Sequence, residues 1–219
     1  MQQILKSTDI PRVRFASVEP WDLGDNFFTL FENPRLMPHM HLPLQSGSDA
    51  VLRRMARRCR TSEFASLVNQ ARSSVPGFNV TTDIIVGFPG ESDEQWRETM
   101  EFVETTGFGH IHVFSFSPRE GTKAATMQEP VAEAVKKKRS AELRELASRL
   151  RRDFIQQQLH TSATVLWEGR PEASQVFGYT ENYTRVCTDS KTAPEAGGVA
   201  ACKLVEVESQ GRFAIVELV

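Results

Sequence analysis

The sequence predicts an α/β fold in which a parallel sheet is followed by a long linking helix and a small all-β module. Over residues 9–126, apolar strand patterns alternate with amphipathic helix patterns, as in right-handed βα units. After residue 160 the helix signals stop, and short runs rich in β-branched residues alternate with turns. This change places a boundary near residue 159 and predicts domains over 1–159 and 160–219.

Four strands are expected in the first domain, and each is an apolar or alternating run bounded by turn residues. They cover residues 13–18, 40–44, 79–86 and 110–116. Four parallel strands do not close a barrel, because closure needs a full ring of tilted strands. The sheet is therefore either open or completed by another segment, and a partial (βα) barrel is expected.

Helices are expected between these strands, at residues 25–31, 49–57, from 61 and from 93. Asn33-Pro34 and Pro76-Gly77 end two of them, because proline disfavours the helical conformation of the residue before it. Ser92 and Gln95 have the spacing of a capping box. Gly107 stands where a C-capping glycine belongs.

A long linking helix is expected from Pro130 to His160, and its apolar stripe includes Leu143 and Leu150. Five short strands should follow, over residues 164–167, 175–179, 184–187, 199–207 and 212–219. Their number favours a small barrel or OB-like module.

Composition limits the classes of function. The chain has 219 residues, 40% hydrophobic and 25% charged, as in an ordinary soluble globular protein. We expect a cytoplasmic protein without a membrane partner, because no apolar run is long enough to span a bilayer. A net charge of −2 gives no general attraction to nucleic acid, so RNA contact must rest on local basic patches. The three cysteines are too few and too scattered for a disulfide framework.

Polar side chains gather where the predicted strands end, which is where α/β proteins bind ligands. The Gln45 amide suits ribose hydroxyls, and Arg57 suits a carboxylate. Asp83 stands among apolar neighbours, where a carboxylate needs partners. Glu19 ends the first expected strand. Gly87 opens a glycine loop whose backbone amides suit a flat base such as adenine.

Four motifs in this order resemble the radical S-adenosylmethionine methylthiotransferases, which modify transfer RNA. They are Ser17-Val18-Glu19-Pro20, the run from His41 to Asp49 (HLPLQSGSD), the run from Thr82 to Glu91 (TDIIVGFPGE) and Phe116-Ser117-Pro118-Arg119. The resemblance implies a partial radical S-adenosylmethionine barrel followed by an RNA-binding TRAM domain. It implies transfer of a methylthio group to C2 of a modified adenosine, N6-threonylcarbamoyladenosine, near the tRNA anticodon.

The resemblance also implies which residues bind. The expected S-adenosyl-L-methionine contacts are Gln45, Arg57, Asp83, Glu19, Ser46 and Gly87. For RNA, they are Tyr179, Tyr183, Arg185, Lys137 and Arg139. The aromatic side chains suit base stacking and the cations suit phosphates. No catalytic residue and no metal ligand is predicted.

One departure from the family pattern is decisive. The family binds its catalytic 4Fe–4S cluster with a Cys-x-x-x-Cys-x-x-Cys loop and a second cluster with cysteines of an N-terminal domain. Cys59, Cys187 and Cys202 have no such spacing. The chain therefore resembles only the C-terminal portion of the family, and we expect it to be inactive alone. A separate cluster-bearing half is a possible partner.

Two other interpretations stay open. The chain is alternatively an inactive RNA-binding module, or one half of a split enzyme. A metal-dependent hydrolase is the third interpretation, because His39/His41 and His110/His112 are His-x-His pairs whose members face one side of a strand. Packed or hydrogen-bonded histidines are the favoured interpretation of these pairs.

Overall fold

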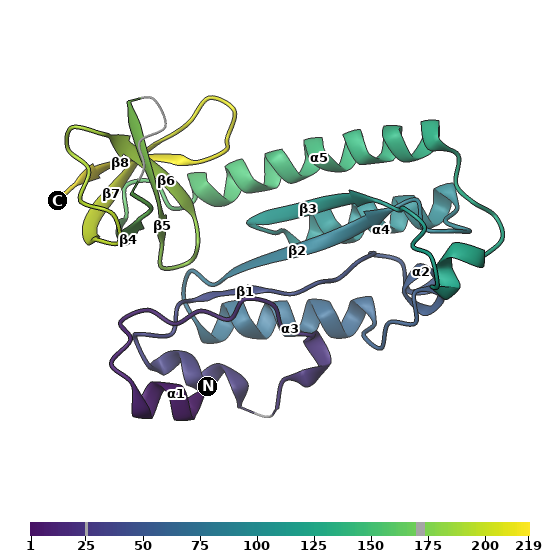
Figure 1. Ribbon diagram of the computed structural model, residues 1–219, viewed down its shortest axis with the longest axis horizontal. Helices are drawn as coiled ribbons and strands as arrows, with labels where there is room; N and C mark the ends of the chain where they lie inside the picture. The colour runs from purple at the N-terminus through teal and green to yellow at the C-terminus, as the bar shows by residue number, and fades with distance from the viewer. Residues whose placement is uncertain (25, 170–173) are drawn as a thin grey trace.

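A computed structural model describes residues 1–24, 26–169 and 174–219 of the chain. Its centre is a parallel sheet in the order β1 (His39–His41), β2 (Asn79–Val86) and β3 (His110–Ser115). Helices α3 (Thr61–Ser74), α4 (Asp93–Thr106) and α5 (Glu133–Gln156) cover one face (Figure 1). The βα rhythm of the sequence is therefore confirmed.

Strand register decides which side chains face the helices. His41 pairs with Thr81, and Asp83 pairs with His112. Successive side chains of a strand point to opposite faces. Met40, next to His41, and Ile84, next to Asp83, are therefore buried under the helices. We call the other side the histidine face. It carries His39, His41, Thr81, Asp83, His110 and His112.

The strand expected over residues 13–18 is wrong as a regular strand. The segment runs beside β1, but its only parallel bridge among the described residues joins Val13 to Leu36. Val18 donates one further hydrogen bond to the His41 carbonyl, 3.1 Å away. Between these points Phe15 packs against Phe27 and Phe31 instead of extending a ladder. The described sheet therefore has three strands rather than four.

The short helices differ from expectation more than the long ones do. The chain opens with α1 (Gln2–Ser7). The helix expected at residues 25–31 is replaced by the 3₁₀ helix η2 (Phe27–Glu32), and its first residue lies outside the described part. Another 3₁₀ helix, η1 (Pro20–Asp22), precedes it. Helix α2 (Asp49–Arg54) ends early because Ala56 adopts a left-handed φ of 56°.

The capping box of Ser92 and Gln95 forms at the start of α4, and Gly107 caps its end with a φ of 66°. A 3₁₀ helix, η3 (Lys123–Thr126), interrupts the polar loop after β3. Helix α5 is shorter at both ends than the expected 130–160. No described helix has the length and apolarity needed to cross a bilayer.

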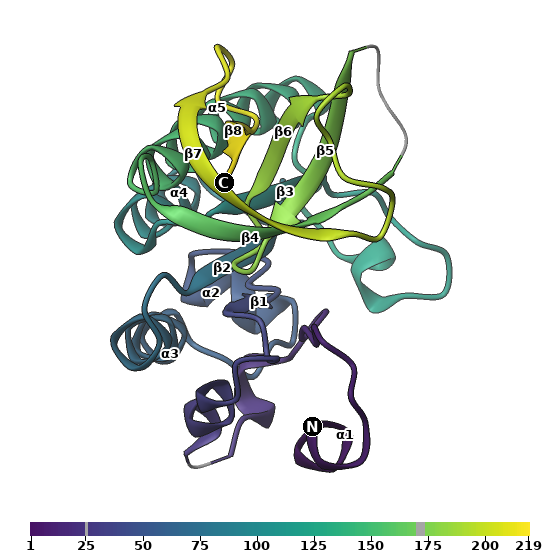
Figure 2. The same ribbon diagram turned by 90° about the vertical axis from the view of Figure 1, so that its left-hand side faces the viewer.

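Five strands after α5 close into a barrel, as the sequence predicted (Figure 2). They are β4 (Ser162–Trp167), β5 (Gln175–Thr180), β6 (Arg185–Asp189), β7 (Val199–Val207) and β8 (Ala214–Leu218). The order around the barrel is β4-β5-β6-β8-β7, with β6 and β8 parallel. Trp167 is the largest side chain buried in the barrel core.

The barrel contacts the sheet at the N-terminal ends of the strands. The Asn79 side-chain amide donates to the Asn182 carbonyl at 2.8 Å, and Arg12 donates to the Thr164 carbonyl at 2.8 Å. The Arg14 guanidinium lies 3.9 Å from the Tyr183 ring centroid. The opposite, C-terminal edge of the sheet is therefore free of the barrel (Figure 1).

Candidate ligand edge, histidine face and basic cavity

Glu19 and Arg57 meet at the C-terminal edge of the sheet. Glu19 follows the segment that runs beside β1, and Arg57 lies three residues beyond the last residue of α2. Arg57 Nη1 is 3.0 and 3.1 Å from the two carboxylate oxygens of Glu19. Both side chains are partly exposed. The pair presents a cation and an anion side by side, which is what a zwitterionic ligand needs.

Gln45 extends the sheet towards this edge. Its backbone N–H donates to the Asp83 backbone carbonyl at 2.8 Å, and its backbone carbonyl accepts from the Ile85 N–H at 2.9 Å. Gln45 itself has a left-handed φ of 77°, which turns the chain at this residue. The next residue, Ser46, is fully buried with its hydroxyl 3.2 Å from that of Thr99. Ser46 therefore packs against α4 instead of facing a ligand.

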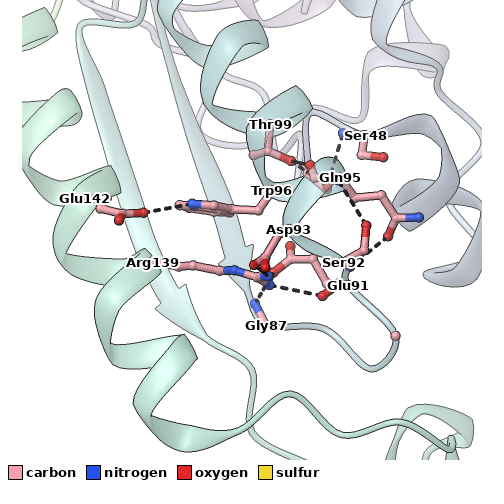
Figure 3. Close-up of polar contacts among 12 residues, drawn as sticks. Ser48, Gly87, Glu91, Ser92, Asp93, Gln95, Trp96, Thr99, Arg139 and Glu142 are labelled. Carbon is pink, nitrogen blue, oxygen red and sulfur yellow. Dashed lines mark hydrogen bonds and ion pairs between the residues drawn. The ribbon is translucent and has the colours of Figure 1, made fainter.

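The glycine loop after β2 is held by a buried ion pair (Figure 3). The Gly87 amide donates to Glu91 at 2.9 Å, and Arg139 of α5 contacts the same Glu91 oxygen at 2.6 Å. The side chains of Arg139 and Glu91 are 5% and 1% exposed. Arg139 also binds Asp93 at 2.7 Å. Burial raises the pKa of Glu91, while the Gly87 amide and Arg139 oppose that rise.

This network changes two expected roles. The Gly87 amide is occupied by Glu91, so it is not a free donor for a base. Arg139 is bound inside the fold, which removes it from the RNA-contacting set and leaves Lys137 as the exposed member. Sequence reasoning missed the Glu91–Arg139 pair. The available signal was that Arg139 falls on the helical stripe of Leu143 and Leu146.

A chain of hydrogen bonds crosses the histidine face. Burial, together with Arg14 and His41, lowers the pKa of His39 to about 3, so its ring is neutral. Arg14 donates to His39 Nδ1 at 3.1 Å, and His39 Nε2–H therefore donates to the Thr81 hydroxyl at 3.0 Å. His41 Nδ1 contacts the same hydroxyl at 3.0 Å.

Asp83 joins this face rather than the Glu19–Arg57 pair. Its carboxylate lies 3.2 Å from His41 Nε2. The ligand atoms of His41, Asp83 and His112 all lie within 4.8 Å of one another. The structure thus brings one member of each His-x-His pair together with a carboxylate. Burial, with His112 and Arg151, lowers the pKa of the other member, His110, to about 4.

A basic cavity of about 350 Å³ lies between the barrel and the N-terminal ends of β2 and β3. Three arginines line it: Arg151, Arg185 and Arg212. Burial and the nearby charge of Arg212 lower the pKa of Arg151, although Glu208 opposes the effect. The crowding of cations here favours an anionic ligand.

Aromatic rings form one wall of this cavity. Tyr179 and Tyr183 stack with their centroids 4.4 Å apart and an interplanar angle of 12°. Asn79 is buried beside them, and its Oδ1 has no hydrogen-bond partner among the residues that the structure describes. Arg185 contacts the Phe177 ring at 4.1 Å. The structure therefore brings together Tyr179, Tyr183 and Arg185, whereas Lys137 lies near the opposite end of α5 from Arg151.

The cysteines do not form a cluster site. Cys59 follows α2, whereas Cys187 and Cys202 are buried on β6 and β7. Burial raises the pKa of the Cys59 and Cys187 thiols to about 11 in each case, and thiolates are what iron binds. Among the described residues, no group of three potential metal ligands includes a cysteine. These thiols do not fit a 4Fe–4S cluster.

Comparison with known proteins gives the class. Residues 8–103 match the radical SAM superfamily. The structure resembles coproporphyrinogen III oxidase from Escherichia coli, a radical SAM enzyme, with a TM-score of 0.56 and 12% identity over 94% of this chain and 50% of that one. The superfamily match thus gives the class for residues 8–103, radical SAM, and the structural likeness shows that the fold agrees with it.

The particular family comes from closer relatives. A threonylcarbamoyladenosine tRNA methylthiotransferase from Thermotoga maritima is 42% identical over 80% of this chain, and one from Bacillus subtilis is 35% identical over 81%. A tRNA-2-methylthio-N(6)-dimethylallyladenosine synthase from Staphylococcus haemolyticus is 38% identical over 93%. The chain belongs to the tRNA methylthiotransferase family. It spans 40%, 40% and 39% of these relatives' lengths.

Proposed function

We propose that this chain is the S-adenosylmethionine- and tRNA-binding portion of a tRNA methylthiotransferase. The target is a modified adenosine near the anticodon, and we favour N6-threonylcarbamoyladenosine over the dimethylallyl nucleoside named for other relatives. The observation that carries the proposal is the Glu19–Arg57 pair at the C-terminal edge of the sheet, where ligands of α/β folds bind.

The pair matches the amino-acid end of S-adenosylmethionine. The α-carboxylate would bind the Arg57 guanidinium, and the α-ammonium would bind the Glu19 carboxylate. Gln45 lies four residues beyond β1, bridged to Ile84 of β2, and would offer its side-chain amide to the ribose hydroxyls. Asp83 would contribute through the neighbouring strand, although its carboxylate is bound to His41 without ligand.

Radical chemistry in this family implies a 4Fe–4S cluster, and the cysteines of this chain do not fit one. We therefore propose that cluster ligands are supplied from outside these residues, and that the chain alone is catalytically silent. The same observation favours the alternative of an RNA-binding module without catalysis. Reconstitution of this chain with iron and sulfide tests whether it is catalytically silent alone. A stable absorbance from a bound iron–sulfur cluster would contradict the proposal.

S-adenosylmethionine binding is expected to weaken roughly tenfold to a hundredfold in Arg57→Ala, because a charge-assisted hydrogen bond contributes about 1.5–3 kcal/mol. Isothermal titration calorimetry measures this directly. Arg58→Ala is the matched control, since Arg58 is the exposed next residue and should leave the affinity unchanged. Equal loss in both variants, or no binding by the unaltered chain, would contradict the assignment.

We propose further that RNA enters through the basic cavity. Three guanidinium groups in one half-enclosed site suit phosphate oxygens, and the stacked tyrosines offer ring surface for a base. This surface lies at the N-terminal ends of the strands, away from the Glu19–Arg57 edge. One RNA would then have to reach both ends of the sheet, which an extended stem-loop can do.

Arg151→Gln is expected to lower the affinity for an anticodon stem-loop and to reduce the slope of log K against log salt by about 1, as the loss of one phosphate contact does. Fluorescence anisotropy over a salt series provides the measurement. Arg149→Gln is the control on the same helix, because Arg149 is exposed and paired with Glu104. An unchanged slope in Arg151→Gln, with thermal stability retained, would refute the cavity as the phosphate site.

A further inference from the structure

We infer that His41, Asp83 and His112 form a binding site for a divalent transition-metal ion of the Zn²⁺ type. The site shares Asp83 with the proposed S-adenosylmethionine contacts and His112 with the lining of the basic cavity, but the inference is argued only from the placement of these three ligand atoms. The ligand atoms come from three adjacent strands or strand ends and lie within 4.8 Å of one another.

The backbone places these three side chains together. In the parallel ladder, Asp83 is paired directly with His112, and His41 is paired with Thr81, two residues before Asp83. All three therefore project from the same face, which the helices leave uncovered. A cavity of about 310 Å³ lies over them, which leaves room for an ion and its water ligands.

The distances suit coordination. Two ligand atoms that each lie about 2.0–2.1 Å from a tetrahedral Zn²⁺ ion stand roughly 3.3 Å apart. His41 Nε2 and Asp83 Oδ2 are 3.2 Å apart. The exposed His112 ring lies edge-on to the His41 ring, with centroids 5.7 Å apart, and would complete the set.

A histidine that binds a metal ion usually donates a hydrogen bond from its other ring nitrogen, and the surroundings of His41 provide the acceptor. When Nε2 binds an ion, Nδ1 carries the hydrogen and needs an acceptor. The Thr81 hydroxyl stands 3.0 Å from His41 Nδ1 and has two lone pairs, one for His41 and one for His39 Nε2–H. The ring of His41 is thus held with Nε2 directed at Asp83.

The donor set selects the kind of ion. Two imidazoles and one carboxylate favour zinc and other late first-row ions, whereas Mg²⁺ and Ca²⁺ prefer oxygen ligands. Three protein ligands on an open face leave at least one position for water, as in zinc sites that bind a further ligand. Imidazole binds a metal ion in its neutral form and aspartate binds as a carboxylate, so a bound dication would leave a single net positive charge on the site.

Metal titration of the complete chain tests the site. Co²⁺ added to metal-free protein should give visible d–d absorption that saturates at one equivalent, and Zn²⁺ should abolish it by displacement. His112→Gln and Asp83→Asn should each remove the saturable signal. Thr81→Val removes the hydroxyl that accepts from both His41 and His39, and should weaken Zn²⁺ binding about 10- to 100-fold.

His110→Gln is the matched control, because His110 lies on the same strand and face, outside the group of three. It should bind Co²⁺ as the unaltered chain does. His112 is exposed, so its replacement should leave the melting temperature unchanged and separate ligand loss from unfolding. Absence of saturable binding in the unaltered chain would overturn the inference. Equal losses in His110→Gln and His112→Gln would also overturn it, because they indicate adventitious binding by surface imidazoles.

Discussion

Arg139→Ala is expected to destabilise the protein by about 3–5 kcal/mol, because it leaves the buried carboxylate of Glu91 without its cation. The pair joins the glycine loop after β2 to helix α5, and both side chains are almost fully buried (Figure 3). Such a loss is a large part of the total stability of a typical domain, about 5–15 kcal/mol. Urea denaturation followed by circular dichroism measures it.

Two comparisons make this result specific. Lys138→Ala changes the adjacent, exposed cation and should alter the free energy of unfolding by less than about 0.5 kcal/mol. Combining Arg139→Met with Glu91→Leu removes both charges, so the double variant should be more stable than either single variant. Additive losses in the double variant would show that the two charges do not depend on each other.

Trp167→Ala is expected to cost about 3–5 kcal/mol and to unfold the barrel. Trp167 is 1% exposed and packs with Val165, Val186 and Leu204. A module of about 60 residues has little stability to lose, because it buries a smaller share of its surface than a large domain does. Hydrogen exchange should show β4–β8 losing protection while β2 and the core under α3 and α4 retain it.

Leu166→Ala is the matched control for Trp167. Leu166 is the preceding residue on β4, is 37% exposed and points outside the barrel core, so its replacement should leave exchange almost unchanged. The experiment also tests the domain boundary expected near residue 159. Simultaneous loss of protection in the barrel and the sheet after Trp167→Ala would mean that the two unfold as one unit, against the expected division.

Local signals in the sequence predicted most of the fold. β2 and β7 have the expected bounds, and Ser92, Gln95 and Gly107 have the capping roles that their spacing predicted. These features depend on residues within a few positions of one another. The prediction of a strand over residues 13–18 was wrong. Alternation of apolar residues indicates which side chains are buried, but a strand also needs a hydrogen-bonding partner along its length, and this segment has only one bridge among the described residues.

The site was less predictable, because its contacts join distant positions. Glu19 and Arg57 were expected at one edge, but their direct pairing depends on how α2 ends. Arg139 was grouped with the exposed lysines before it, although its helical phase buries it. The association of His41 and His112 through Asp83 requires the register of three strands, which one sequence does not specify.

Strand β3 lies at the border of the sheet, since β2 is its only partner among the described strands. Its outer backbone N–H and C=O groups therefore offer a template to which an incoming strand can hydrogen-bond. Phe114, 52% exposed on this strand, adds an apolar contact for such a strand. Unpaired strand edges are also where separate protein chains pair with one another, so handling the protein in isolation calls for conditions that discourage edge-to-edge pairing.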